Sequence, residues 1–272
     1  MREKVNGFVG VMAVAILCMV SGLCMVWGIA PVVLAVYVAA CAVCGRYMIT
    51  CIGCTAGVAA GSMGIAGLLH AYEYMIPGPA YSGVMVTEKY LVLLGLAMCL
   101  MKIVYSRNSR SYVRVIVVMS AAVLMGNIVV YADNMLMAAA YGVVEAAIFM
   151  CASVILKPGI GLLYTYICGD ASDVERDESW NISQGIVSLM ALAAVVLWVV
   201  PGEDIYGVNP AFMLALVLIL YAVYRTGAVY GCGMAAVAGS IVSVKLNDSR
   251  WLMWMLLVTL VMLIGRALTG RR

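Results

Sequence analysis

The sequence predicts an all-α membrane protein, a polytopic bundle of about ten transmembrane helices with both termini in the cytoplasm. Apolar residues make up 66% of the 272 residues and charged residues only 11%, whereas a soluble domain carries roughly 25% charged residues. The mean hydropathy is +1.09. The apolar residues fall into successive runs of near-spanning length, and the basic residues fall unevenly between these runs. We therefore expect residues 1–272 to form a single transmembrane domain.

Ten apolar runs define the predicted helices, since a spanning helix needs about 20 apolar residues. The second and fourth runs are short, and the first two could form a helical hairpin broken near Pro31. The start of the chain has the charged n-region of an export signal, but its apolar run has full spanning length, which favours an uncleaved first helix. The predicted helices are residues 8–27, 29–44, 48–69, 90–104, 113–131, 135–155, 182–200, 208–224, 226–244 and 251–268.

The lysines and arginines orient these helices. If the N-terminus is cytoplasmic and ten helices alternate, thirteen basic residues fall in inside segments and three in outside segments, which is the bias that the positive-inside rule describes. The outside residues are Lys89, Lys245 and Arg250. The inside residues are Arg2, Lys4, Arg46, Lys102, Arg107, Arg110, Arg114, Lys157, Arg176, Arg225, Arg266, Arg271 and Arg272. Both termini are therefore expected in the cytoplasm of a multi-pass cell-membrane protein.

Aromatic residues near the proposed helix ends support these boundaries, because amphipathic rings prefer the level of the lipid headgroups. They are Trp27, Tyr47, Tyr90, Tyr105, Tyr112, Tyr131, Trp180, Tyr224 and Trp251.

Small residues recur every four positions in two predicted helices. One set is Gly53, Gly57 and Gly61, and the other is Gly227, Gly231, Ala235 and Gly239. This spacing puts each set on one helix face, where another helix can approach closely in lipid. Packing within the chain is the favoured interpretation, and packing between copies of the protein is the alternative.

Two cysteine pairs have the spacing of a zinc site. Cys41 and Cys44 end one predicted helix, and Cys51 and Cys54 lie early in the next. Four thiolates so placed could converge on a metal. Six further cysteines are scattered through apolar runs, and cysteine packs as a small hydrophobe. Apolar packing is therefore the favoured interpretation, and neither a metal nor a cofactor is expected.

Glu145 is the one acidic residue deep within a predicted helix, near its middle. A charge at the bilayer centre costs about 2.5–3.5 kcal/mol on insertion scales. The residue should therefore face the bundle or be protonated. We expect a hydrogen bond to a neighbouring helix, with Asn127 or a backbone carbonyl as its partner, and the sequence offers no basic partner in another helix. Ion or proton translocation is the alternative interpretation.

No catalytic centre is expected. His70 is the only histidine, beside Glu73 at the outer end of a predicted helix, and no nucleophile motif accompanies it, so acid–base or metal catalysis has nothing to assemble from. The net charge is only +3, and no basic patch indicates nucleic acid binding. The lipid bilayer is the expected partner.

Several motifs resemble the membrane domain of stage II sporulation protein E. They are Tyr131–Asn134 between two helices, Val144-Glu145-Ala146 followed by Lys157-Pro158, Ser183–Leu189, and the glycine-rich stretch Tyr224–Gly231 with Gly239. The resemblance covers residues 30–245, in the same order and with the same helix count. One departure is Gln184 and Gly185, where the family has paired glutamates.

The resemblance implies a role in membrane anchoring and oligomerisation at the sporulation septum, with self-association and contacts to cell-division and sporulation proteins. The family continues into a cytoplasmic serine phosphatase, and residues 1–272 contain only the membrane portion, so no enzymatic activity is expected of them. The alternative function is a secondary transporter of a small molecule or ion that uses Glu145.

Overall fold

The computed structural model describes residues 2–23, 30–61, 83–104, 109–131, 134–168, 182–200 and 209–268. These residues form ten helices, and no strand occurs among them. The predicted all-α class is therefore confirmed for this part of the chain. The chain divides into two compact units, Met1–Asn181 and Ile182–Arg272, where the sequence predicted a single domain. We refer to them as the N-terminal unit and the C-terminal unit.

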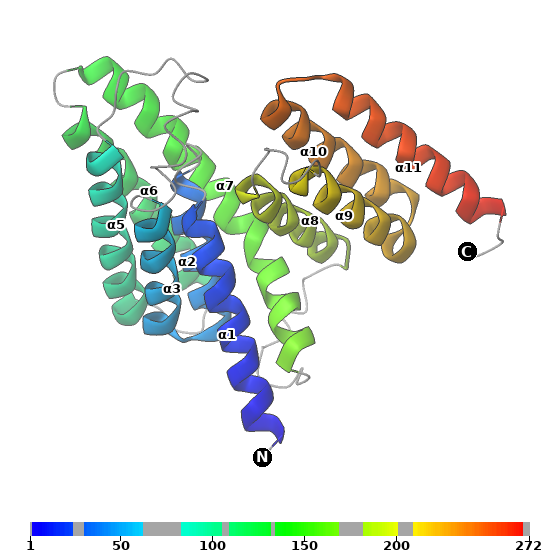
Figure 1. Ribbon diagram of the computed structural model, residues 1–272. Helices are drawn as coiled ribbons and strands as arrows, with labels where there is room; N and C mark the ends of the chain where they lie inside the picture. The colour runs from blue at the N-terminus through cyan, green and yellow to red at the C-terminus, as the bar shows by residue number, and fades with distance from the viewer. Residues whose placement is uncertain are drawn as a thin grey trace. The chain divides into compact units, whose positions relative to one another are not determined.

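The N-terminal unit is built around one enclosed helix. Its members are α1 (Arg2–Leu23), α2 (Ala30–Cys44), α3 (Tyr47–Ala60), α5 (Gly83–Val104), α6 (Ser109–Val130) and α7 (Met135–Cys168). Helix α2 packs against α1, α3, α5 and α7, and every residue from Val32 to Cys41 is buried. A helix that is apolar on all sides is expected in such a central position. Figure 1 shows α1 and α3 side by side in this unit.

Helix α7 is longer than predicted. It runs for 34 residues to Cys168, about 51 Å at 1.5 Å per residue, whereas the prediction ended at residue 155. Pro158 lies inside it and removes one backbone hydrogen bond. Ile160 is buried two residues later, so apolar packing continues past the proline. The predicted end was therefore wrong by thirteen residues.

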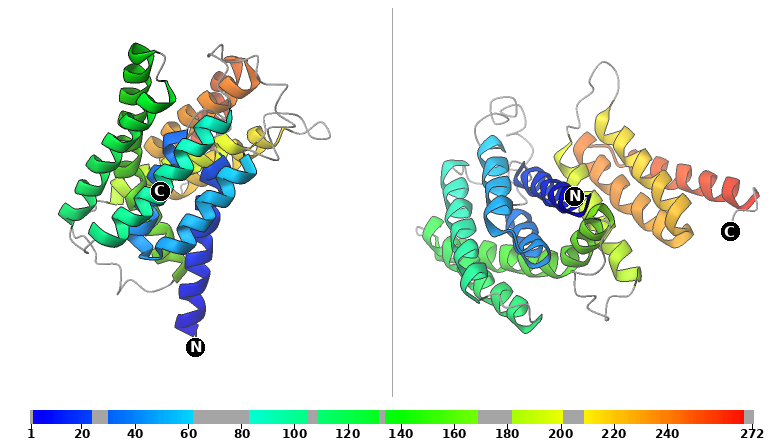
Figure 2. Two further views of the ribbon diagram at one scale, coloured as in Figure 1. Left: turned by 90° about the vertical axis from the view of Figure 1, so that its left-hand side faces the viewer. Right: turned by 90° about the horizontal axis from the view of Figure 1, so that it is seen from below.

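The C-terminal unit contains α8 (Ile182–Val199), α9 (Pro210–Thr226), α10 (Ala228–Leu246) and α11 (Arg250–Leu268). Helix α10 packs against the other three, and α9, α10 and α11 lie next to one another in Figure 2. The core of the unit includes Leu197 from α8, Ile219 from α9, Met234 from α10 and Met255 from α11.

Hydrogen bonds from two basic side chains show how these four helices run relative to one another. The Lys245 ammonium at the end of α10 donates to the Val200 carbonyl that follows α8. The Arg266 guanidinium near the end of α11 donates to the Val223 carbonyl near the end of α9. Cations at helix C-termini satisfy free carbonyls and the helix dipole. The ends of α8 and α10 therefore lie together, as do those of α9 and α11, and the four helices alternate in direction.

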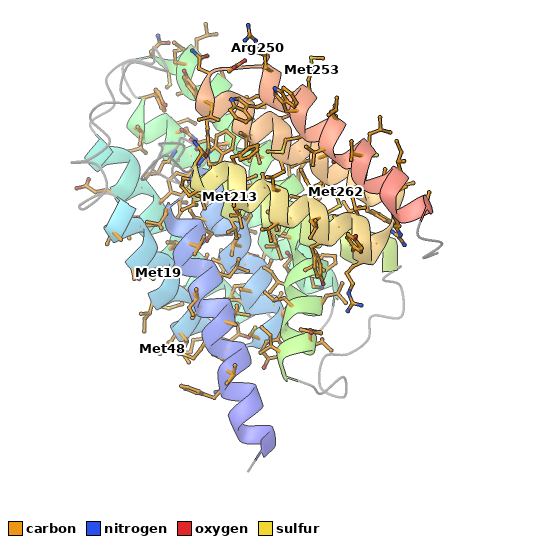
Figure 3. All side chains as sticks on the ribbon, turned by 45° about the vertical axis from the view of Figure 1, so that its right-hand side comes forward. Met19, Met48, Met213, Arg250, Met253 and Met262 are labelled. Atoms are coloured by element: carbon orange, nitrogen blue, oxygen red, sulfur yellow. The ribbon has the colours of Figure 1, made fainter. Side chains whose placement is uncertain are left out.

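Four helices are long and apolar enough to cross a membrane, judged by length and composition: Tyr112–Val130, Met135–Ile167, Ala228–Leu246 and Arg250–Ala267. Large apolar side chains are exposed on many helices, as Figure 3 shows for Met48 and Met253. Such exposure is unusual for a soluble monomer. These features indicate a membrane-associated protein.

Candidate functional site: a buried ion-pair cluster in the N-terminal unit

A polar cluster joins α5, α6 and α7. The Lys89 Nζ atom lies 2.7 Å from Oε2 of Glu145 and forms an ion pair with it. The same ammonium donates to Asn127 Oδ1 at 3.1 Å. Asn127 Nδ2 and the Tyr90 hydroxyl both donate to Glu145 Oε2, at 2.7 and 3.0 Å. We call these four residues the Glu145 cluster.

Each member comes from a defined position on its helix. Lys89 and Tyr90 lie in the second turn of α5, Asn127 near the end of α6, and Glu145 in the first third of α7. Two of the residues, Tyr90 and Asn127, are fully buried, and the Lys89 side chain is only 4% exposed. Burial of this kind needs a compensating charge, because an isolated ion is costly in a medium of low dielectric.

Two glycines make room for the cluster. A Cβ atom on Gly126 would lie 3.3 Å from Cγ and Cδ of Lys89, so the lysine stem runs over the bare backbone of α6. A Cβ atom on Gly142 would lie 3.5 Å from Cβ of Asn127. Small residues at both positions therefore allow α6 to lie close to the lysine and to α7.

The Glu145 carboxylate uses only one of its two oxygens in the hydrogen bonds of the cluster. All three hydrogen bonds that it accepts in the described part of the chain go to Oε2, and the side chain is 20% exposed. Tyr141 lies one turn earlier on α7, and its ring stacks on Tyr131 at a centroid distance of 5.2 Å. The carboxylate therefore faces the cluster with one oxygen, and its side chain is partly exposed.

The cluster lies near one end of the α5–α6 pair. Asn127 is three residues before the end of α6 at Val130, about 5 Å along the helix axis. Glu145 is ten residues after the start of α7. Because α7 extends beyond the predicted helix, Glu145 does not lie at its middle, as the sequence had suggested.

The sequence does not identify Lys89 and Tyr90 as partners of Glu145. It predicts Lys89 outside the membrane and Tyr90 at a helix end, because the predicted helix begins at residue 90. The structure begins α5 at Gly83 and so places both residues inside the helix. The apolar residues Val84, Met85 and Val86 are the signal that could have extended the predicted helix.

The cysteine pairs do not converge as a metal site. Cys41 and Cys54 are buried, and Cys44 and Cys51 are half-buried. The Cys41 Sγ atom lies 3.2 Å from the Thr50 hydroxyl, which links α2 to α3. Among the described residues, no group of three or more His, Cys, Asp or Glu side chains could hold a metal. His70 and Glu73 lie outside the described residues.

The packing glycines of α3 face α1. A Cβ atom on Gly57 would lie 2.1 Å from the carbonyl oxygen of Met19, and one on Gly53 would lie 2.6 Å from that of Ala15. Gly61 is buried at the C-terminal cap of α3. The four-residue spacing predicts close helix packing, and at Gly53 and Gly57 the helix that packs closely is α1 of the same unit.

The second set of small residues divides into two kinds. A Cβ atom on Gly231 would meet Val223 of α9 at 2.6 Å, and one on Gly239 would meet Leu252 of α11 at 3.0 Å, while Ala235 is fully buried. Gly227 lies between α9 and α10 with φ +97°, a conformation that favours glycine. Gly227 therefore forms the turn and is not part of the packing face that the sequence had assigned to it.

Comparisons of the chain with protein-family models, with curated proteins and with solved structures found no match.

Proposed function

We propose that this chain is a multi-pass membrane domain with an anchoring and scaffolding role, of the kind that the resemblance to the sporulation phosphatase implies. The observation that carries this proposal is the Glu145 cluster, in which the carboxylate is neutralised by Lys89 and hydrogen-bonded by Asn127 and Tyr90. An anchor needs a stable membrane fold and no conducting path. An ion pair whose two charges neutralise each other within one unit stabilises the fold and is consistent with the absence of a conducting path.

The proposed domain has ten spans, although α2 and α3 have only 15 and 14 described residues. About 20 residues are needed to cross the hydrocarbon core. Helix α2 is enclosed by four other helices, so in this arrangement protein and not lipid surrounds it, and a short helix is tolerated there. We propose that both termini are cytoplasmic, on the basis of the charge distribution.

Self-association is part of the proposal and must use faces other than the glycine faces. Gly57 is occupied by α1, Gly231 by α9 and Gly239 by α11. The outward faces of α6 and α7 carry Val117, Val129 and Val143, all more than half exposed. These faces meet lipid or another copy of the chain.

The test is the location of a fluorescent fusion of the full chain in sporulating cells, combined with carbonate extraction of membranes. We expect the fusion to resist extraction and to concentrate at the septum. Extraction by carbonate would contradict the membrane anchor. Even fluorescence over the whole membrane would contradict the septal role and leave the anchor standing.

Transport is the second candidate function, favoured by the exposed part of Glu145, whose Oε1 atom accepts no hydrogen bond among the described residues. A partly exposed carboxylate beside a lysine could bind a proton or cation. The test is flux of protons or monovalent cations into proteoliposomes that contain the full chain. Transport requires flux above that of empty liposomes and its loss in Glu145→Gln, whereas the anchoring proposal expects no flux with either protein.

A further inference from the structure

The end of the α5–α6–α7 group opposite the Glu145 cluster carries three basic side chains at one level. Lys102 follows Lys89 by thirteen residues on α5, Arg114 precedes Asn127 by thirteen on α6, and Lys157 follows Glu145 by twelve on α7. Helices α6 and α7 run antiparallel, because Asn127 meets Glu145 and Tyr112 meets Ser153. Helices α5 and α6 also run antiparallel, because the start of α5 meets the end of α6 at Lys89 and Asn127 and only four residues separate the end of α5 from the start of α6. Each basic residue therefore lies about 18–20 Å along its helix from the cluster. We call Lys102, Arg114 and Lys157 the basic rim.

Contacts between α6 and α7 confirm this level. The Tyr112 hydroxyl donates to the Ser153 carbonyl at 2.6 Å, and the Lys157 ammonium lies 4.7 Å from the centroid of the Tyr112 ring. Tyr112 is also the first residue of the apolar span of α6. On α6, Tyr112 therefore lies where the apolar span gives way to headgroups, the usual level for tyrosine and lysine in a membrane protein. The apolar span of α7 continues past Lys157 to Ile167.

The rim is strongly positive. Lys102 and Arg114 are exposed, and the stretch from residue 102 to 114 also contains Arg107 and Arg110 but no acidic residue. The nearest acidic stretch in sequence begins at Asp170, after α7 ends.

Resting on the proposed membrane-spanning function, we propose that the basic rim is a docking surface for anionic phospholipid headgroups. With Arg107 and Arg110 from the same stretch of the sequence, the basic residues number five. This number is within the charge count that marks such surfaces, and the cytoplasmic leaflet supplies the anionic lipid. The phosphate of a phosphatidylglycerol or similar lipid lies among Lys102, Arg114 and Lys157, while its acyl chains run along the exposed apolar faces of α6 and α7. The cation–π contact holds Lys157 in place for this role.

The experiment is native mass spectrometry of the full chain in neutral detergent, titrated with phosphatidylglycerol or phosphatidylcholine of the same acyl chains. We expect phosphatidylglycerol to bind at least tenfold more tightly. Arg114→Gln and Lys102→Gln should each weaken its binding about fivefold and leave phosphatidylcholine unchanged. The matched control is Arg250→Gln, an exposed arginine at the start of α11 in the C-terminal unit, labelled in Figure 3, which should have no effect.

Equal affinity for the two lipids would overturn the inference. A loss of phosphatidylglycerol affinity in Arg250→Gln as large as that in Arg114→Gln would overturn it as well. Displacement of the bound lipid by soluble glycerol phosphate at equal concentration would show a phosphate site and not a lipid surface. Flotation of the chain with phosphatidylcholine vesicles separates the two proposals. A chain that floats but shows no lipid preference refutes only the rim, and one that does not float refutes the membrane domain itself.

Discussion

At the residue scale, the central feature is a carboxylate whose charge is balanced across three helices. The sequence was enough to single out Glu145, because an acid within an apolar run requires a partner, and Asn127 donates a hydrogen bond to it in the structure. Lys89 could not be found in the same way, since a lysine next to an apolar run has the appearance of a loop residue. Only the spatial arrangement shows that its side chain runs over Gly126 to reach Glu145.

Removing one member of the pair should be far worse than removing both. We expect Lys89→Met and Glu145→Gln each to lower the free energy of unfolding by about 2–4 kcal/mol, because a single change leaves a buried charge without its counter-ion. The double variant should recover more than half of this loss. Thermal unfolding of the purified protein in detergent, analysed as a double-mutant cycle, measures the coupling.

Glu88→Gln is the control, since Glu88 precedes Lys89 on α5 but is exposed. It should change the free energy of unfolding by less than about 0.5 kcal/mol. If the two single variants were as stable as the wild type, the ion pair would have no structural role. Strictly additive losses in the double variant would show that Lys89 and Glu145 act independently.

At the element scale, helix positions could be predicted well and helix partners could not. Seven of the ten described helices end within three residues of the predicted end. The predicted ends of α1 and α3, at residues 27 and 69, lie outside the described residues, and α7 continues thirteen residues past its predicted end. Apolar length fixes where a helix lies, but a proline gives the same local signal whether the helix stops or continues past it. The four-residue glycine spacing in α3 predicted close packing, yet nothing in the spacing identified α1 as the neighbour.

The crossing of α1 and α3 should therefore be intolerant of any side chain. We expect Gly57→Ala to lower the free energy of unfolding by more than about 2 kcal/mol, because its methyl group would overlap the Met19 carbonyl, which belongs to backbone and cannot rotate away. The measurement is thermal unfolding in detergent together with the yield of folded protein from membranes.

Gly95→Ala in α5 is the matched control, since a Cβ atom there meets nothing within 4 Å. Alanine should be neutral at this position or stabilise the helix by up to about 1 kcal/mol. A tolerated Gly57→Ala would mean that α1 and α3 do not cross as closely as the structure has them.

At the scale of the whole molecule, the two units each have an internally consistent helix direction. In the N-terminal unit, the Glu145 cluster and the basic rim lie at opposite ends of α5, α6 and α7. In the C-terminal unit, the Lys245 and Arg266 contacts pair the ends of alternate helices. The sequence could not predict a division into two units, since apolar runs of similar length carry no information on which helices pack together. Charge bias does predict a direction for every helix, and that direction can be tested.

Topology reporters can distinguish ten spans from the four helices that qualify by length and composition alone. Both arrangements keep the termini on one side, so terminal fusions do not separate them. The two differ at residue 80, between α3 and α5, and at residue 204, between α8 and α9. Ten spans put Ala80 and Asp204 outside, whereas four spans leave both in the cytoplasm with the N-terminus.

We expect alkaline phosphatase fused after either residue to be active and a green fluorescent protein there to be dark, with the reverse at Arg272. Fluorescence at residues 80 and 204 would reduce the fold to four crossings. It would then require the enclosed helix α2 to lie outside the hydrocarbon core, although all ten residues from Val32 to Cys41 are buried and apolar.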